Sequence, residues 1–169
     1  MQSKIMNAPK GNPEEIDKIK IRKASSSDLE AVYQIECEQF PNPWKKKYFS
    51  EELLHDIANF YVAEDKSVQQ VIGYVIFWIV EEMLELHKIA VSASYTGRGI
   101  GKRLFRFMLE KAVEQGVEEL FLEVRKSNIG AIKLYESFAF KQIDIRKDYY
   151  NEPTEDALIF KLILSPGNE

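Results

Sequence analysis

Two side chains in the second half of the chain could do acid–base chemistry, and a third could hold a ligand. Glu123 lies in the segment ELFLEVR, whose other residues are mainly apolar. A carboxylate in such surroundings is poorly solvated and can act as a base near neutral pH. Asn128 and Tyr135 lie seven residues apart on a predicted helix, so two turns bring them to the same side. A phenol and an amide directed at one place supply a proton donor and a hydrogen bond to a ligand.

Each of these residues also has a purely structural interpretation. Glu123 could pair with Arg125, or point to solvent from an edge strand. Asparagine is a favoured helix cap, so Asn128 could serve only to start its helix. Tyr135 could simply pack in the core. These alternatives stay open at the level of the residues alone.

The strand predicted over residues 83–91 carries two further candidates. By strand alternation, Glu85 and His87 share one face with Ile89 and Val91. Either polar side chain could act as a base or orient a water. No cysteine or second histidine lies at a metal-ligand spacing, so we expect no metal. The sequence also lacks a G-x-S-x-G segment, which argues against a serine hydrolase.

A glycine-rich segment, VSASYTGRGIGKRL at residues 91–104, joins that strand to a predicted helix. Gly97, Gly99 and Gly101 alternate with single residues, and helical periodicity follows. The start of a helix leaves backbone N–H groups free for a phosphate, and glycine lets the backbone approach it. Arg98, Lys102 and Arg103 add positive charge. The spacing fits neither the P-loop nor the dinucleotide fingerprint, and an ordinary turn with solvated basic residues is the alternative.

Composition limits the class of protein. The 169 residues are 45% apolar and 30% charged, which is typical of one globular domain. The formal net charge of −4 argues against direct nucleic-acid binding. The single cysteine, Cys37, forms no internal disulfide and is expected to be a small buried residue. No apolar run reaches membrane-spanning length and no secretory signal is visible, so we expect a cytoplasmic protein without a membrane partner.

Periodicity and turn signals predict an α/β (α+β) domain with a mixed central sheet of about seven strands, flanked by about four helices. Residues 1–17 are expected to be a flexible tail and residues 18–165 the domain. A capping box of Ser27 and Glu30 is expected to start the first helix. The expected strands cover residues 18–23, 60–63, 68–80, 83–91, 119–125, 140–147 and 157–164, and the helices residues 27–38, 50–56, 100–116 and 127–137.

The segment Phe40-Pro41-Asn42-Pro43-Trp44 must interrupt the helical pattern, because two prolines flank Asn42. Its aromatic residues are typical of a recognition surface. A packed corner, with Phe40 and Trp44 buried for stability, explains them equally well. A second loop is expected over residues 148–156.

Together these segments resemble the GNAT superfamily of N-acetyltransferases. The family's loop pattern, Arg/Gln-x-x-Gly-x-Gly/Ala, is here T-G-R-G-I-G, with Thr96 at the usual Arg or Gln position. Within the superfamily the chain is similar to the ribosomal-protein alanine N-acetyltransferase (RimI-like) family. The matching strings are FPNPW, IAV, LEVRKSN, AIKLYESFAF and DYYNEPTEDALIF, within residues 19–164.

The resemblance implies acetyl-CoA as the co-substrate, without a metal. It places the pantetheine arm along Ile89, Ala90 and Val91, and implies a contact with Asn128. The resemblance also assigns the pyrophosphate to the backbone of the glycine loop, at Gly97, Arg98, Gly99, Ile100, Gly101 and Lys102.

The resemblance further implies that Glu123 is the general base and Tyr135 the general acid that protonates the CoA thiolate. Glu85 is the second-choice base, at the position used by the histone-acetylating branch. The peptide groove is implied to involve Phe40, Pro41, Trp44, Tyr149 and Tyr150.

The first hypothesis is therefore a protein N-terminal acetyltransferase that acts on a protein or peptide N terminus, such as that of a ribosomal protein, as a monomer or weak dimer. A GNAT enzyme that acetylates a small amine or lysine side chains is the second. A non-catalytic acyl-CoA-binding module is the third, although such a module needs neither Glu123 nor Tyr135. A peptide panel and variants of these two residues discriminate among them.

Overall fold

The computed structural model describes residues 18–164, so the predicted tail of residues 1–17 lies outside the described residues. A seven-stranded mixed sheet forms the centre, with strand order β1-β2-β3-β4-β5-β7-β6. The strands are β1 (Ile19–Lys23), β2 (Ala58–Asp65), β3 (Gln70–Val80), β4 (Met83–Val91), β5 (Glu119–Arg125), β6 (Lys141–Tyr150) and β7 (Glu155–Ile163). The helices are η2 (Ser26–Asp28), α2 (Leu29–Gln39), α3 (Lys46–Leu54), η3 (Ala93–Tyr95), α4 (Ile100–Glu114) and α5 (Ile129–Ser137).

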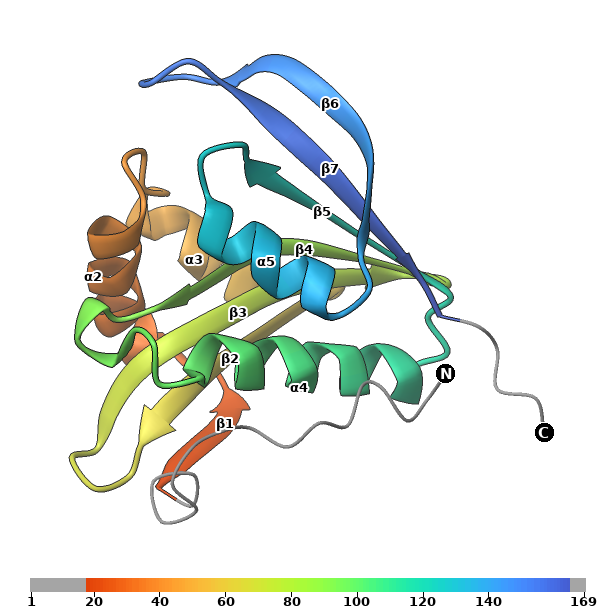
Figure 1. Cartoon of the computed structure of the whole chain (residues 1–169). Helices are drawn as coiled ribbons and strands as arrows, with labels where there is room; N and C mark the ends of the chain where they lie inside the picture. The colour runs from red at the N-terminus through yellow and green to blue at the C-terminus, as the bar shows by residue number, and fades with distance from the viewer. Residues whose placement is uncertain (1–17, 165–169) are drawn as a thin grey trace.

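The helices cover both faces of the sheet, with α2 and α3 on one side and α4 and α5 on the other (Figure 1). Neighbouring strands are antiparallel except for β4 and β5, which run parallel and are joined through α4. This arrangement confirms the predicted fold class, number of strands and four α-helices among the described residues.

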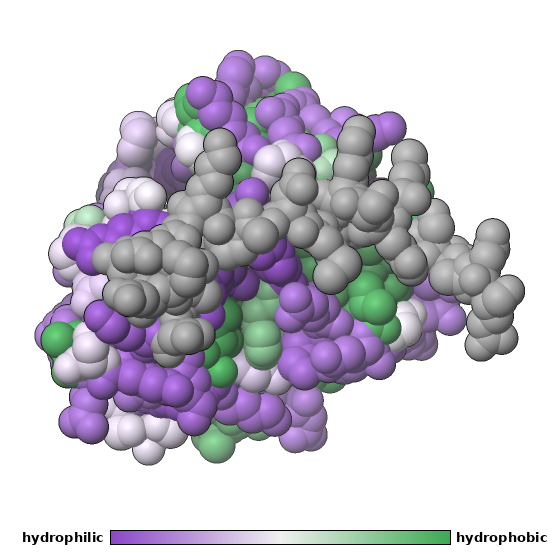
Figure 2. Space-filling view, turned by 60° about the horizontal axis from the view of Figure 1, so that its bottom comes forward, coloured by the Kyte–Doolittle hydropathy of each residue, from purple (hydrophilic) through white to green (hydrophobic). Residues whose placement is uncertain are grey.

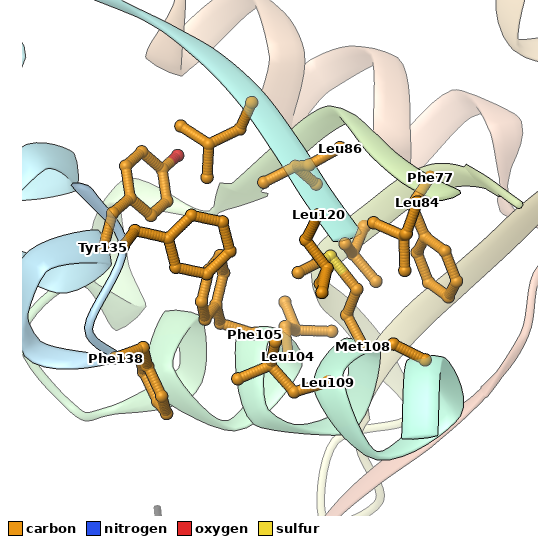
Figure 3. Close-up of a cluster of buried hydrophobic side chains, with 14 of the residues drawn as sticks. Phe77, Leu84, Leu86, Leu104, Phe105, Met108, Leu109, Leu120, Tyr135 and Phe138 are labelled. Atoms are coloured by element: carbon orange, nitrogen blue, oxygen red, sulfur yellow. The ribbon is translucent and has the colours of Figure 1, made fainter. Parts of the chain in front are cut away.

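The larger of two apolar clusters lies under α4 and α5. The helical repeat of Ile100, Leu104 and Met108 is buried against strands β3, β4 and β5, as its period predicts. Aromatic rings from α4 and α5 extend the cluster, with the Phe105 and Tyr135 ring centroids 5.3 Å apart. Figure 3 shows these side chains converging from the sheet and both helices.

Close packing of α4 on the sheet explains the glycine in β3. A Cβ atom at Gly73 would lie 3.0 Å from the carbonyl oxygen of Ala90 and 3.1 Å from Cδ1 of Leu104. The register of β2 against β3 also shifts beside this residue. The backbone of β3 thus makes a close contact at Gly73, and a larger residue there would push the helix away.

Several local expectations were wrong. Cys37, expected to be buried, is exposed on α2. The capping box uses Ser25 and Asp28, and the intervening residues form the short helix η2, so Ser27 and Glu30 do not pair. Helix α3 begins at Lys46, four residues earlier than predicted, because Pro43 and not Ser50 marks the end of the interruption. The predicted loop of residues 148–156 is mostly strand, because β6 extends to Tyr150 and β7 begins at Glu155.

A bulge in β4 overturns the predicted alternation of that strand. Lys88 lies opposite Ile76 and Leu86 opposite Phe77, which leaves His87 between them without a partner in β3. Leu86 before the bulge and Ile89 after it both pack in the α4–α5 cluster. Glu85 therefore does not share a face with Ile89 and Val91.

The part of the surface that is visible on the side of α4 is mainly hydrophilic (Figure 2). In this view it shows hydrophobic residues only in small separate patches (Figure 2). Among residues 18–164, no helix is long and apolar enough to cross a membrane.

Candidate active site

Strands β4 and β5 separate in the middle of the sheet. They pair only from Met83–Glu119 to Leu86–Leu122, while β4 continues beside β3 to Val91 and β5 continues beside β7 to Arg125. Figure 1 shows the two strands diverging. Beyond Leu86, the side of β4 that faces β5 carries backbone groups that no described strand covers. An extended ligand can pair with these groups at Ile89–Val91.

The glycine loop ends at the amino terminus of α4, next to this opening. Gly97 and Gly99 have φ angles of 81° and 78°, in the left-handed region that favours glycine. Gly99 is the N-cap of α4, and no side chain caps the helix. The N–H of Arg103 bonds back to the carbonyl of Gly99 at 3.0 Å. The N–H groups of residues 100–102 thus lie at the positive end of the helix, where an anion is stabilised.

The three basic residues of the loop are not equivalent. The Arg98 guanidinium lies 4.8 Å from the Tyr95 ring, and the Lys102 ammonium 5.9 Å from the Phe138 ring. Arg103 instead donates a hydrogen bond to the carbonyl of Ile19 on β1, at 3.1 Å. Arg103 therefore reaches toward β1, whereas Arg98 and Lys102 lie over aromatic rings.

Glu123 lies just past the last β4–β5 pair, and its side chain is 25% exposed. It forms an ion pair with Arg146 of β6. The expected alternative partner, Arg125, pairs instead with Glu155 at 3.6 Å. No sequence signal indicated Arg146, because its approach to Glu123 depends on β7 and β6 folding back beside β5. The carboxylate thus has a charged partner in addition to its apolar neighbours.

The two tyrosines of β6 lie near the same carboxylate. Burial and, second, the charge of Glu123 raise the pKa of Tyr150 to about 12. The same two causes raise the pKa of Tyr149, whose side chain stays partly exposed. Both phenols therefore keep their protons at neutral pH. The predicted groove residues Tyr149 and Tyr150 are thereby brought to Glu123, although from a strand and not from a loop.

Tyr135 packs in the core and Asn128 caps a helix, as their purely structural interpretations predict. Tyr135 is 4% exposed and packs among Phe105, Phe140 and Phe160. Burial raises the pKa of its hydroxyl well above the usual value, with a smaller contribution from Tyr150, so it is protonated at neutral pH. Asn128 is exposed and caps α5, where its side chain accepts a 3.2 Å hydrogen bond from the Ala131 N–H. Neither contact excludes the predicted role, because each group keeps further hydrogen-bonding capacity.

A shallow hollow of about 290 Å³ opens beside Glu123. Glu85 also lines it, with a side chain 61% exposed and 3.8 Å from Nε2 of His87. The His87 ring stacks on Trp78 with centroids 4.4 Å apart. The other lining residues are Val80, Met83, Leu84, Phe121, Leu122, Arg146 and Ile159. The hollow thus offers two carboxylates beside apolar walls.

The loop Phe40–Trp44 forms the packed corner that was one of its two predicted interpretations. Phe40 and Trp44 are half-buried and pack on the apolar cluster under α2 and α3, while Pro41 is exposed. The Asn42 side chain donates hydrogen bonds to the carbonyls of Asn151 and, at 3.1 Å, Glu152 in the β6–β7 turn. Two segments over a hundred residues apart therefore meet beside Tyr149 and Tyr150.

Comparison with known proteins decides the family. The model of the acetyltransferase (GNAT) family matches residues 29–140, well over half of the chain. The chain belongs to the GNAT acetyltransferase family. It is an acetyl-CoA-dependent N-acetyltransferase, and among the described residues no cluster of metal-ligating side chains is present.

Several GNAT proteins are similar over most of their length. A Bacillus subtilis (strain 168) protein, provisionally named [ribosomal protein bS18]-alanine N-acetyltransferase, is 37% identical over 142 residues, covering 84% of this chain and 93% of the relative. The crystal structure of the Escherichia coli ribosomal-protein-S18-alanine N-acetyltransferase is 31% identical, with a TM-score of 0.81 over 89% of this chain and 97% of that one.

A more distant structure shares the fold. Arabidopsis thaliana NAA60, solved in complex with acetyl-CoA, is 22% identical with a TM-score of 0.79, over 86% of this chain and 98% of that one. GNAT structures thus bind acetyl-CoA as the co-substrate. The predicted family and its RimI-like branch are confirmed.

Proposed function

We propose that this GNAT enzyme transfers acetyl from acetyl-CoA to the α-amine of a protein N terminus, with a ribosomal protein as the target. The observation that carries the proposal is the similarity, over nearly the whole relative, to enzymes named for acetylation of the N-terminal alanine of ribosomal protein bS18. The meeting of the loop Phe40–Trp44 with the β6–β7 turn supports a peptide acceptor, because this turn directly follows Tyr149 and Tyr150, which lie near Glu123.

Acetyl-CoA supplies the thioester carbonyl. The uncovered backbone of Ile89, Ala90 and Val91 is suited to pair with its pantetheine arm. The uncapped N–H groups at Gly97–Lys102, with Arg98 and Lys102, suit its pyrophosphate. Asn128 adds a side-chain amide at the start of α5.

Glu123 is the proposed general base. An α-ammonium group is mostly protonated at neutral pH, so the acceptor must lose a proton before it can attack. The ion pair with Arg146 holds the Glu123 carboxylate in place, and its partial exposure allows a bridging water to carry that proton. Glu85, across the same hollow, is the second-choice base.

Tyr135 is the proposed general acid. Its raised pKa keeps the hydroxyl protonated, and the surrounding aromatic side chains exclude bulk water. The free amine attacks the thioester carbonyl directly and forms the amide bond, so no acyl-enzyme forms. Tyr135 delivers its proton to the CoA sulfur as the C–S bond breaks. A backbone N–H near Val91 stabilises the developing oxyanion. Positioning of both substrates contributes much of the remaining acceleration.

A peptide panel tests the proposal. Peptides that differ only in their first residues, each with a free α-amine and one internal lysine, are incubated with acetyl-CoA and mapped by mass spectrometry. We expect acetyl only on the α-amine, with a preference among first residues. Matched peptides with a blocked amino terminus are the control and should stay unmodified. Transfer to lysine alone, or only to small amines such as polyamines, would refute the α-amine assignment.

A further inference from the structure

The loop Phe40–Trp44 is held by a carboxylate that the proposed mechanism does not use. Glu36, on α2, is 0% exposed. Its Oε1 accepts hydrogen bonds from the backbone N–H of Trp44 and from Nζ of Lys88, both at 2.8 Å, and its Oε2 accepts one from the Tyr74 hydroxyl. A buried carboxylate is costly unless it is paired and hydrogen-bonded. Here three donors from the loop, β4 and β3 satisfy it.

Lys88 makes a second contact with the same loop. Its side chain is 13% exposed, and its ammonium lies 3.9 Å from the ring centroid of Phe40 and 5.0 Å from that of Trp44. Aromatic faces attract cations, more strongly where water is excluded. The Glu36–Lys88 pair therefore contacts the loop in two ways. Glu36 binds the backbone of Trp44, and Lys88 lies against the rings of Phe40 and Trp44.

The pair also ties this loop to the strand of the active site. Lys88 follows the β4 bulge and directly precedes Ile89–Val91, the proposed site of the pantetheine arm. A buried ion pair is a poor device for stability alone, because apolar groups of similar volume often stabilise a fold equally well. The pair fixes a specific geometry between the loop and β4, because its hydrogen bonds are directional, whereas an apolar contact would not.

We propose that Glu36, acting with Lys88, is a positioning residue that fixes the loop Phe40–Trp44 against β4 and so sets the binding of the acceptor. This inference rests on the proposed function, in which that loop borders the acceptor groove. Neither residue touches the reacting atoms. Their effect is on the Michaelis constant for the acceptor and not on the handling of acetyl-CoA.

Steady-state kinetics of three variants test this role. The triple variant E36L/Y74F/K88M replaces the whole network by apolar groups, so that it avoids an unpaired buried charge and should fold. We expect it to keep the parental thermal stability and acetyl-CoA KM but to raise the peptide KM about tenfold. The double variant E36Q/K88M keeps a carbonyl acceptor for the Trp44 N–H, leaves no unpaired buried charge and should recover most of the peptide affinity. Glu30→Gln, an exposed site on the same helix, is the matched control and should behave as the parent.

Two outcomes would overturn the proposal. A parental peptide KM in the triple variant would show that the loop does not need the network. An equal rise in both KM values together with a lower melting temperature would show a role in stability only. If the parent acetylates no peptide, the proposed function fails instead. Acrylamide quenching of Trp44 emission, measured in a Trp78→Phe background, then decides the inference alone: greater quenching in the triple variant supports it, and unchanged quenching refutes it.

Discussion

The two faces of the sheet differ in what they bury. Under α4 and α5 the described core is made of apolar and aromatic side chains, with Tyr135 at its edge (Figure 3). Under α2 and α3 a smaller apolar cluster surrounds buried charges, because Asp28 and Glu36 lie there with their partners Arg22 and Lys88. Burial of apolar surface stabilises the first face, whereas specific ion pairs add to the smaller apolar cluster of the second.

The difference extends to how each face could bind a substrate. Next to α4 and α5 the candidate cofactor groups are backbone atoms of β4 and the glycine loop, whose positions depend on the packed core. Next to α2 and α3 the candidate acceptor groups are side chains of the loop Phe40–Trp44 and of β6. Backbone sites tolerate sequence change, whereas side-chain sites can be tuned. A co-substrate common to a family suits the first, and a variable acceptor suits the second.

The largest effect should come from Glu123, the proposed base, which would act where the acceptor and acetyl-CoA meet. Glu123→Gln keeps the size of the side chain and removes the proposed base, so we expect kcat to fall about 10²- to 10⁴-fold. The dissociation constant of acetyl-CoA, measured by calorimetry, should stay within about twofold, since the variant changes no group of the proposed cofactor site. Parental turnover would transfer the role to Glu85, for which Glu85→Gln is the matching variant.

A second large effect should come from the apolar face. Tyr135→Phe keeps the packing with Phe105 but removes the proposed acid, and we expect kcat to fall about a hundredfold. The free energy of unfolding should change by less than about 1 kcal/mol. Tyr61→Phe, a buried tyrosine elsewhere in the same cluster, is the control for loss of a phenol. A similar loss of turnover in both variants would mean that packing, and not proton transfer, is affected.

Sequence reasoning succeeded where the signal is local. The period of α4 and the turns around each strand predicted the elements and the fold, because each follows from neighbouring residues. The bulge at His87 was not predicted, since it depends on the pairing of β4 with β3. Arg146 was missed because only β7 brings it to Glu123. Glu36 did have a signal: it lies four residues after Val32, in line with the buried side of α2.

The face with buried charges should be the more sensitive to acid. The Asp28 side chain is 6% exposed and accepts two 2.8 Å hydrogen bonds from Arg22. The guanidinium lowers the pKa of Asp28 below its usual 3.8, although burial opposes this. The pair therefore stabilises the fold above pH 3.8, and this stability is lost as the pH falls through the lowered pKa. In Asp28→Asn we expect about 2 kcal/mol less stability at pH 7 and a smaller further loss in acid, measured by urea unfolding. Equal pH slopes for parent and variant would contradict this assignment.

A smaller effect should separate backbone strain from cofactor binding. Gly99→Ala places a side chain at a φ of 78°, and Gly116→Ala does so at 71° at the other end of α4. In both positions a Cβ atom would meet open space, so each variant should lose about 1–2 kcal/mol of stability through strain alone. Only Gly99→Ala should raise the acetyl-CoA KM, by about tenfold, because it disturbs the N–H groups of the loop. Equal acetyl-CoA KM values in the two variants would argue against the phosphate assignment.

The smallest effect should come from the contact between the loop and the β6–β7 turn. Asn42→Ala removes two exposed hydrogen bonds to the carbonyls of Asn151 and Glu152. Because water can replace them, we expect less than about 1 kcal/mol of lost stability and a rise of about two- to fivefold in the peptide KM. The acetyl-CoA KM should not change, since the loop lies next to α2 and α3, away from the proposed cofactor groups. Asn59→Ala, whose only described side-chain bond is local at 3.4 Å, is the control. A change confined to acetyl-CoA would break the division of the two faces between the two substrates.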